Sequence, residues 1–357
     1  MKLITIVGAR PQFIKAAAVS REIKSCGLIE EIIIHTGQHF DKNMSDIFFE
    51  EMNIPKPNYN LQIHGLPHGA MTGRMIEGIE EIIIKEKPDM LMVYGDTNST
   101  LAGALAAKKM NVKLAHVEAG LRSFNYEMPE EINRILTDRI SDILFCPTDT
   151  AIENLKKEGF EHFPWKIVKS GDVMQDAALF YAQQSASKSK IISQLNLENK
   201  KFVLCTIHRQ ENTDKLENLN SIVNGLNKIS KETIIVFPAH PRTQQILKKQ
   251  NLSLQFQMID PLGYFDMIEL LKSCSLVITD SGGLQKEAFF FQKHCITVRE
   301  QTEWVELVKH GFSTIVGTDE TKMYQAFKNL SNKQTDFNID LYGNGKACEM
   351  IVKELLN

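Results

Sequence analysis

Short runs of apolar and β-branched residues recur along the chain, and each is followed by a stretch with helical spacing of apolar positions. The runs lack strict alternation of apolar and polar residues, which indicates strands buried on both faces. Strands that alternate with helices predict parallel sheets covered by helices on both sides. The expected strands are KLITIV (2–7), EEIIIH (30–35), DMLMVY (89–94), VKLAHV (112–117), DILFC (142–146), FVLCTI (202–207), TIIVFP (233–238), LVIT (276–279), CITV (295–298) and STIV (313–316).

The length of the chain predicts two domains, because 357 residues exceed what one ordinary core holds. The polar, serine- and lysine-rich stretch 183–200 is the linker candidate, and a hinge near 169–176 is the alternative. We therefore expect an α/β protein with two doubly wound, Rossmann-type domains that face each other across a cleft. In such sheets the loops that follow the strands carry the chemistry.

Composition is that of a soluble globular protein, with 43% hydrophobic and 24% charged residues. The net charge of -3 gives no reason to expect a nucleic acid or an anionic membrane as partner. No apolar run reaches the roughly 18–20 residues of a membrane span, and the N-terminus lacks a signal-peptide pattern. The six cysteines form no CxxC pair and read as reduced core thiols, so we expect a cytoplasmic protein.

Two loops in the first half are candidates for chemistry. VGARPQFIK (7–15) brings Arg10 and Lys15 to a helix N-terminus, which favours an anion. It has neither the glycines of a dinucleotide fingerprint nor a P-loop lysine, and two surface bases on a strand–turn–helix joint also explain it. In YGDTNST (94–100), Asp96 is either an acid at a strand exit or part of an ordinary helix cap.

HVEAGLRSFNYEMPEE (116–131) contains a cluster of carboxylates. Glu118 ends a buried strand, where a charged group needs a partner or a function. Pro129 is typical of the first position of a helix, and Glu130 and Glu131 then suit its first turn. We assign Glu131 to an ion pair with Arg134, one helical turn later, and keep Glu130 as a candidate for chemistry.

Two strand exits in the second half carry a histidine next to an arginine. CTIHRQEN places His208 and Arg209 after one strand, and FPAHPR places His240 and Arg242 after the next. A lone histidine at such a position is more often a packed or capping group than a catalyst. The histidines and acids match no zinc-ligand spacing, so no metal is expected.

ITDSGGLQKEAFFF (278–291) is the strongest local signal. After its strand, Ser281, Gly282 and Gly283 begin a helix, and the two glycines allow a ligand close to the backbone amides. Glu287 lies one turn inside, where it can accept hydrogen bonds from vicinal hydroxyls such as those of a ribose. A glycine-rich turn is the simpler alternative. Together, the loops predict a nucleotide-sugar site with a diphosphate cradle and acids facing the sugar.

The ordered motifs GARPQFIK, TGQH, YGDTNSTLAGALAA, HVEAGLRS…MPEEINR, TDSGGLQKEA and YGNGKACEMI resemble those of the non-hydrolysing UDP-N-acetylglucosamine 2-epimerase family. The resemblance covers almost the whole chain. It implies a GT-B-like fold and a homodimer. It also implies a first domain of residues 1–171, joined by a last helix at about 344–357, and a second domain of residues 172–343.

The family resemblance also implies a reaction, the inversion of C2 in a UDP-linked 2-acetamido sugar. UDP is eliminated to leave a 2-acetamidoglucal and then adds again, without a metal or a nicotinamide cofactor. Matched position by position, Asp96, Glu118, Glu130 and His208 are the catalytic candidates, and the substrate-binding candidates are Arg10, Lys15, Arg209, His240, Ser281, Gly282, Gly283 and Glu287.

Some positions depart from the family pattern. Trp304 stands where an arginine that contacts the nucleotide is usual, and Phe40 stands where a basic residue is common. The segments TEWVELV, KEAFFF and GDVMQDAALF are similar to a sub-branch that acts on UDP-2,3-diacetamido-2,3-dideoxy-glucuronic acid for bacterial surface polysaccharide. A uronate requires a cation near C6, and Arg122, Arg209 and Arg242 are candidates.

Three other functions share parts of this pattern. A hydrolysing 2-epimerase releases UDP and free sugar irreversibly. A GT-B glycosyltransferase shares the diphosphate cradle but needs an acceptor, and the carboxylates of the first half argue against it. A nucleotide-sugar sensor without turnover would tolerate Asp96→Asn and Glu118→Gln.

Overall fold

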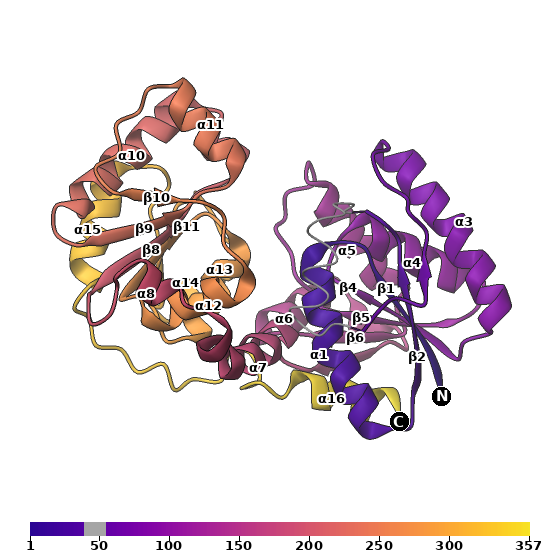
Figure 1. Cartoon of the computed structure of the whole chain (residues 1–357). Coiled ribbons are helices and arrows are strands. Elements are labelled where there is room, and N and C mark those ends of the chain that lie inside the picture. The colour runs from indigo at the N-terminus through magenta and orange to yellow at the C-terminus, as the bar shows by residue number, and fades with distance from the viewer. Residues whose placement is uncertain (39–54) are drawn as a thin grey trace. The chain divides into compact units, whose positions relative to one another are not determined.

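The computed structural model describes residues 1–38 and 55–357, without the Arg10 side chain (Figure 1). The chain divides into two compact units, one of Met1–Ala177 with Asp340–Asn357 and one of Ala178–Ile339. Phe40, one of the departures from the family pattern, lies outside the described residues.

Unit 1 contains a parallel sheet in the order β3-β2-β1-β4-β5-β6-β7. Its described strands are β1 Lys2–Val7, β2 Glu30–His35, β3 Tyr59–Asn60, β4 Met90–Tyr94, β5 Lys113–Val117, β6 Ile143–Cys146 and β7 Lys166–Lys169. The register pairs Tyr94 with Val117, so β4 and β5 end at the same edge of the sheet. Isoleucine, leucine, valine and methionine from β1, β2, β4 and α3 form the core between sheet and helices, which explains the continuous apolar runs.

The helices of unit 1 follow its strands in the βα rhythm that the sequence predicts. The described ones are α1 Arg10–Cys26, α3 His68–Glu86, α4 Asn98–Lys109, α5 Pro129–Ile140, α6 Asp149–Lys157, the short 3₁₀ helix η1 Phe160–His162 and α16 Ala347–Leu355, while α7 Val173–Lys188 crosses the unit boundary. The C-terminal helix α16 packs beside α1 (Figure 1). Asp176 accepts hydrogen bonds from the first amides of α16, Ala347 N at 3.2 Å and Cys348 N at 2.9 Å.

Unit 2 repeats the doubly wound pattern with a parallel sheet in the order β10-β9-β8-β11-β12-β13. Its strands are β8 Phe202–Thr206, β9 Ile234–Pro238, β10 Gln257–Ile259, β11 Leu276–Thr279, β12 Cys295–Thr297 and β13 Ser313–Ile315. Its helices are α8 Ile191–Gln194, α9 Gln210–Thr213, α10 Leu216–Ser230, α11 Pro241–Lys249, α12 Tyr264–Ser273, α13 Gly282–Phe290, α14 Val305–Lys309 and α15 Glu320–Leu330.

The predicted parallel α/β architecture is confirmed, and every expected strand forms. The expected linker 183–200 is different, since it contains the end of α7 and all of α8. Ile191 and Leu197 from this stretch are buried in the apolar core of unit 2, which explains why the polar segment is ordered. No helix of the described ranges is long and apolar enough to cross a membrane.

Candidate active site

Several of the predicted site residues follow strands at the topological switch point of each sheet. Chain order reverses between β1 and β4 in unit 1 and between β8 and β11 in unit 2, and ligands of doubly wound sheets bind at such points. Asp96 follows β4, His208 follows β8, and Ser281 follows β11. The sheet order therefore brings together, within each unit, loops that are distant in sequence.

A buried glutamine that the sequence analysis missed joins the two loops of the unit 1 switch point. Gln12 Oε1 accepts from Gly8 N at 2.8 Å and Ala9 N at 3.0 Å, after β1. Its Nε2 donates to Tyr94 O at 2.7 Å, at the end of β4, and to Thr97 Oγ1 at 3.0 Å. Both halves of the amide are used, so the loop before α1 and the loop that contains Asp96 are fixed to one another.

Glu118 adopts a left-handed backbone conformation, with φ 74° directly after β5. This conformation is rare for a residue with a long side chain, and such residues are concentrated at functional sites. The Glu118 carboxylate forms an ion pair with Lys15 of α1, and both side chains are 9% exposed. The partner that a buried glutamate needs is therefore the lysine from the first loop, a pairing the sequence analysis did not predict.

Asp96 and Glu131 share one guanidinium. Arg134 pairs with Asp96 through Nη2 and with Glu131 through Nη1 at 2.9 Å, so the predicted pair of Glu131 and Arg134 is confirmed. Burial raises the pKa of Asp96 and the nearby Glu118 charge adds to this, while Arg134 acts in the opposite direction. Asp96 remains 33% exposed, so solvent or a ligand can reach a carboxyl group suited to proton transfer.

Glu131 anchors the loop before α5. It is fully buried and accepts from Ser123 N and Phe124 N, each at 2.9 Å. Glu130 is exposed in the first turn of α5, which begins at Pro129 as expected. Buried and exposed carboxylates thus stand side by side in sequence, and Glu130 is the one accessible to a ligand.

A buried aspartate organises the switch point of unit 2. Asp280 is fully buried, and its carboxylate accepts from His208 N at 3.0 Å and Arg209 N at 3.0 Å. His208 Nδ1 lies 3.2 Å from Asp280 Oδ1, while the imidazole is 49% exposed. A carboxylate at Nδ1 favours the tautomer that carries the proton there, which leaves Nε2 as the outer nitrogen. The sequence analysis assigned Asp280 no role.

The loop from β11 to α13 places the residues predicted for the cradle at the start of a helix. Ser281 Oγ caps the helix by accepting from Leu284 N at 3.4 Å, and Gly282 and Gly283 follow as its first residues. An added Cβ at Gly282 would lie 2.6 Å from Glu303 Oε1, so the Glu303 side chain lies directly over this glycine. Glu287, one turn later, accepts from Tyr264 Oη at 3.3 Å.

Other predicted cations have structural contacts. His240 caps α11 by accepting from Arg242 N at 3.3 Å, and Arg242 pairs with Asp214. Arg122 is 5% exposed, and its guanidinium is bound by Asp138 at 2.7 Å and by both oxygens of Glu158 at 2.6 and 2.8 Å. These bonds exclude Arg122 as a uronate ligand in this conformation.

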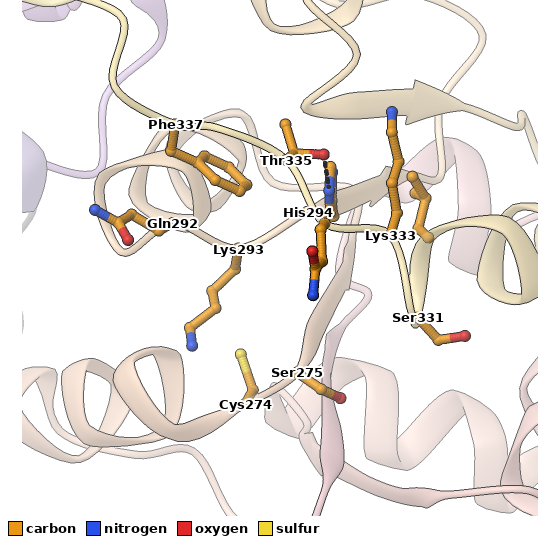
Figure 2. Close-up of a pocket in the computed structure, with 11 residues that line it drawn as sticks. Cys274, Ser275, Gln292, Lys293, His294, Ser331, Lys333, Thr335 and Phe337 are labelled. Atoms are coloured by element: carbon orange, nitrogen blue, oxygen red, sulfur yellow. Dashed lines mark hydrogen bonds between the residues drawn. The ribbon is translucent and has the colours of Figure 1, made fainter.

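The structure contains cavities away from these loops. One of about 320 Å³ lies where β11 and β12 begin, at the opposite edge of the unit 2 sheet, and is lined by Ser275, Lys293, His294 and Lys333 (Figure 2). His294 Nε2 there lies 2.9 Å from Thr335 Oγ1. No group of three or more histidine, cysteine, aspartate or glutamate side chains suited to a metal occurs in residues 1–38 and 55–357.

The family model for UDP-N-acetylglucosamine 2-epimerase matches residues 21–356. The chain belongs to this family. It is 56% identical over 356 residues to the UDP-2,3-diacetamido-2,3-dideoxy-D-glucuronate 2-epimerase of Pseudomonas aeruginosa, and the match covers 99% of each chain. The relatives are UDP-sugar 2-epimerases, which are isomerases.

Solved structures of the family have the same fold. The UDP-GlcNAc 2-epimerase of Methanocaldococcus jannaschii in complex with UDP-GlcNAc and UDP has a TM-score of 0.87 at 43% identity, with 100% of this chain and 99% of that chain covered. The Neisseria meningitidis enzyme bound to UDP-GlcNAc has a TM-score of 0.88 at 28% identity, with full coverage of both chains. The predicted GT-B-like α/β class is confirmed.

Proposed function

We propose that the chain inverts C2 of UDP-2,3-diacetamido-2,3-dideoxy-glucuronate by elimination and re-addition of UDP. The identity of 56% over 99% of both chains with the Pseudomonas aeruginosa enzyme carries the choice of substrate. UDP-GlcNAc is the second candidate, since the Methanocaldococcus jannaschii structure in complex with that sugar is 43% identical to this chain.

The carboxylates of unit 1 support proton transfer at C2. One carboxylate takes the C2 proton while the C1–O bond breaks, and UDP leaves with that electron pair. A proton then returns to the opposite face of C2 as UDP adds to C1. We propose Asp96, Glu118 and Glu130 for these transfers. The pairs of Glu118 with Lys15 and of Asp96 with Arg134 keep the acids at fixed positions, as general acid–base catalysis requires.

The residues of unit 2 support binding of the nucleotide. The amides of Ser281, Gly282 and Gly283 and the positive end of the α13 dipole suit a diphosphate. Glu287 would accept from the ribose hydroxyls. Arg209 and His208 would oppose the charge that develops on the departing UDP, and His240 and Arg10 complete the proposed set of binding residues.

The uronate carboxylate of the proposed substrate needs a cation, and two of the three predicted arginines remain. Arg242 is 38% exposed and pairs with Asp214, which is 50% exposed. Arg209 donates from Nε to Asp280 O at 2.9 Å, and its Nη1 lies 3.9 Å from Glu211 Oε1 in a partly exposed ion pair that a ligand carboxylate can replace. We therefore propose Arg209 or Arg242 for this role.

Proton exchange at C2 tests the function. The enzyme is incubated in heavy water with each UDP-sugar and followed by NMR. We expect deuterium at C2 and the manno epimer, faster with the diacetamido uronate. Asp96→Asn and Glu118→Gln should abolish exchange but keep UDP binding. Irreversible release of free sugar would indicate the hydrolysing enzyme, and absence of exchange with both sugars would refute the proposal.

We also propose that the enzyme is a cytoplasmic homodimer that supplies precursors of surface polysaccharide such as O-antigen. Exposed apolar side chains of unit 1, Phe124, Tyr126, Ile132 and Leu136, are suited to an interface between two copies. The six cysteines are free thiols, which suits a reducing compartment. Sedimentation of the wild type and of Ile132→Glu/Leu136→Glu tests the dimer, because the charges should yield a monomer.

A further inference from the structure

A fully buried histidine of β5, His116, has a hydrogen-bond acceptor at each ring nitrogen. Nδ1 lies 2.7 Å from Asp138 Oδ1, and Nε2 lies 2.7 Å from the carbonyl oxygen of Gly95. A carbonyl oxygen has no proton to give. Asp138 is ionised, because its other oxygen accepts from Arg122 Nη1 at 2.7 Å and Gly120 N at 3.1 Å.

These contacts define the protonation state of His116. A neutral imidazole has one N–H, and its second nitrogen would then direct a lone pair at an acceptor 2.7 Å away. The imidazolium donates to both acceptors. Its charge also balances the cluster, since His116 and Arg122 then match the two carboxylates Asp138 and Glu158. Burial alone would raise the pKa of Asp138, but His116 and Arg122 lower it.

The same imidazole lies between two backbone segments that carry proposed catalytic acids. Gly95 directly precedes Asp96, and its amide donates to Val117 O at 3.0 Å, next to Glu118. Gly95 has φ 64°, and an added Cβ would lie 3.3 Å from Glu118 Oε2. The carbonyl that His116 binds therefore belongs to the peptide that joins Gly95 to Asp96, and Gly95 itself lies next to the Glu118 carboxylate.

We propose that His116 is a positioning residue that donates from both ring nitrogens and so holds the Gly95–Asp96 peptide against the strand that leads to Glu118. Asp138 completes the arrangement by binding the amide of Gly120, on the other side of Glu118. The inference rests on the proposed catalytic roles of Asp96 and Glu118. The charge on His116 itself can be measured without reference to catalysis.

The first test is ¹⁵N NMR of the ligand-free wild-type protein with labelled histidine. We expect both ring nitrogens of His116 to carry protons at pH 8, and the exposed His162 serves as the reference signal in the same spectrum. His116→Gln identifies the signal by its loss. A single protonated nitrogen on His116 would overturn the assigned charge.

The second test separates positioning from folding. His116→Gln can donate one hydrogen bond across the gap, not two in opposite directions, so the Gly95 segment should shift. We expect kcat for C2 exchange to fall about a hundredfold, the typical effect of a displacement near 1 Å, with KM and UDP affinity within twofold. His162→Gln is the matched control and should match wild type.

The rate is normalised to UDP-binding sites, so a purely structural role would leave kcat per site unchanged and overturn the inference. Wild-type kcat in a folded His116→Gln protein would do the same. If this variant does not fold, the NMR measurement on the wild type still decides the charge. A wild type that exchanges no C2 proton would refute the proposed function, while the NMR result would stand independently.

Discussion

Gly283→Ala separates binding at the proposed diphosphate cradle from stability. The nearest heavy atom to a Cβ at Gly283 is Ser281 Oγ at 3.9 Å, so alanine fits without a clash. Within α13, alanine reduces the entropy of the unfolded chain, and we expect an increase of about 0.4–1 kcal/mol in the free energy of unfolding. The melting temperature of the ligand-free protein should rise by about one to four degrees.

The same methyl group would lie beside the amides that we assign to the diphosphate. Loss of one hydrogen bond to a charged group costs about 1.5–3 kcal/mol, which weakens UDP binding about 10- to 150-fold in calorimetric titration. Gly282→Ala is the contrasting variant, because its Cβ would lie 2.6 Å from Glu303 Oε1 and should displace this side chain from its ion pair with Arg299, so the gain in stability should be smaller than for Gly283→Ala. Gly283→Ala with wild-type UDP affinity would refute the cradle.

Three further predictions concern charge, backbone and thiols. Arg134 opposes the burial that raises the pKa of Asp96, so Arg134→Gln should raise this pKa further. Because the protonated acid cannot act as a base, the acid limb of the pH–rate profile should move to higher pH. If the limb does not move, the ionisation that sets it is not that of Asp96. Gly171→Ala, at φ 84°, places a Cβ 2.5 Å from a backbone carbonyl oxygen and should lower the free energy of unfolding in urea by more than about 2 kcal/mol. Gly27→Ala, at φ 69° with open space around it, should lower it by only about 1 kcal/mol. Equal losses would mean that the clash relaxes. A thiol reagent should label Cys26 alone in the native protein and six thiols in urea, because burial keeps the others inaccessible; fast native labelling of a second thiol would contradict this burial.

The central strands of both sheets could be predicted from sequence, but three strands could not. β3, β7 and β10 are edge strands. A strand inside the sheet has helices over both faces and a neighbouring strand on each side. β7, with the sequence KIVK, has two apolar residues and no fully buried side chain. An edge strand leaves little apolar pattern, because part of its surface faces solvent. The missed strands were therefore those for which the hydrophobic signal is weakest.

Sequence identified most acids of the candidate site but not the contacts that separate their roles. Glu130 and Glu131 are adjacent glutamates in one helical turn, yet one is exposed and the other is fully buried among the loop amides it binds. The helical spacing predicted only the contact of Glu131 with Arg134. The bond from the same Arg134 to Asp96 joins residues 38 positions apart, so no local pattern could predict it.

Arg122 and His116 show why these contacts matter for function. In sequence both are polar residues that flank Glu118, and Arg122 was a reasonable cation for a uronate. In the structure, Asp138 binds both of them and is fully buried. A buried carboxylate that lost one of these cations would be left undercompensated, at a cost of several kcal/mol. Neither side chain is therefore free to bind substrate, and we expect both to act on the reaction only through the backbone that carries Asp96 and Glu118.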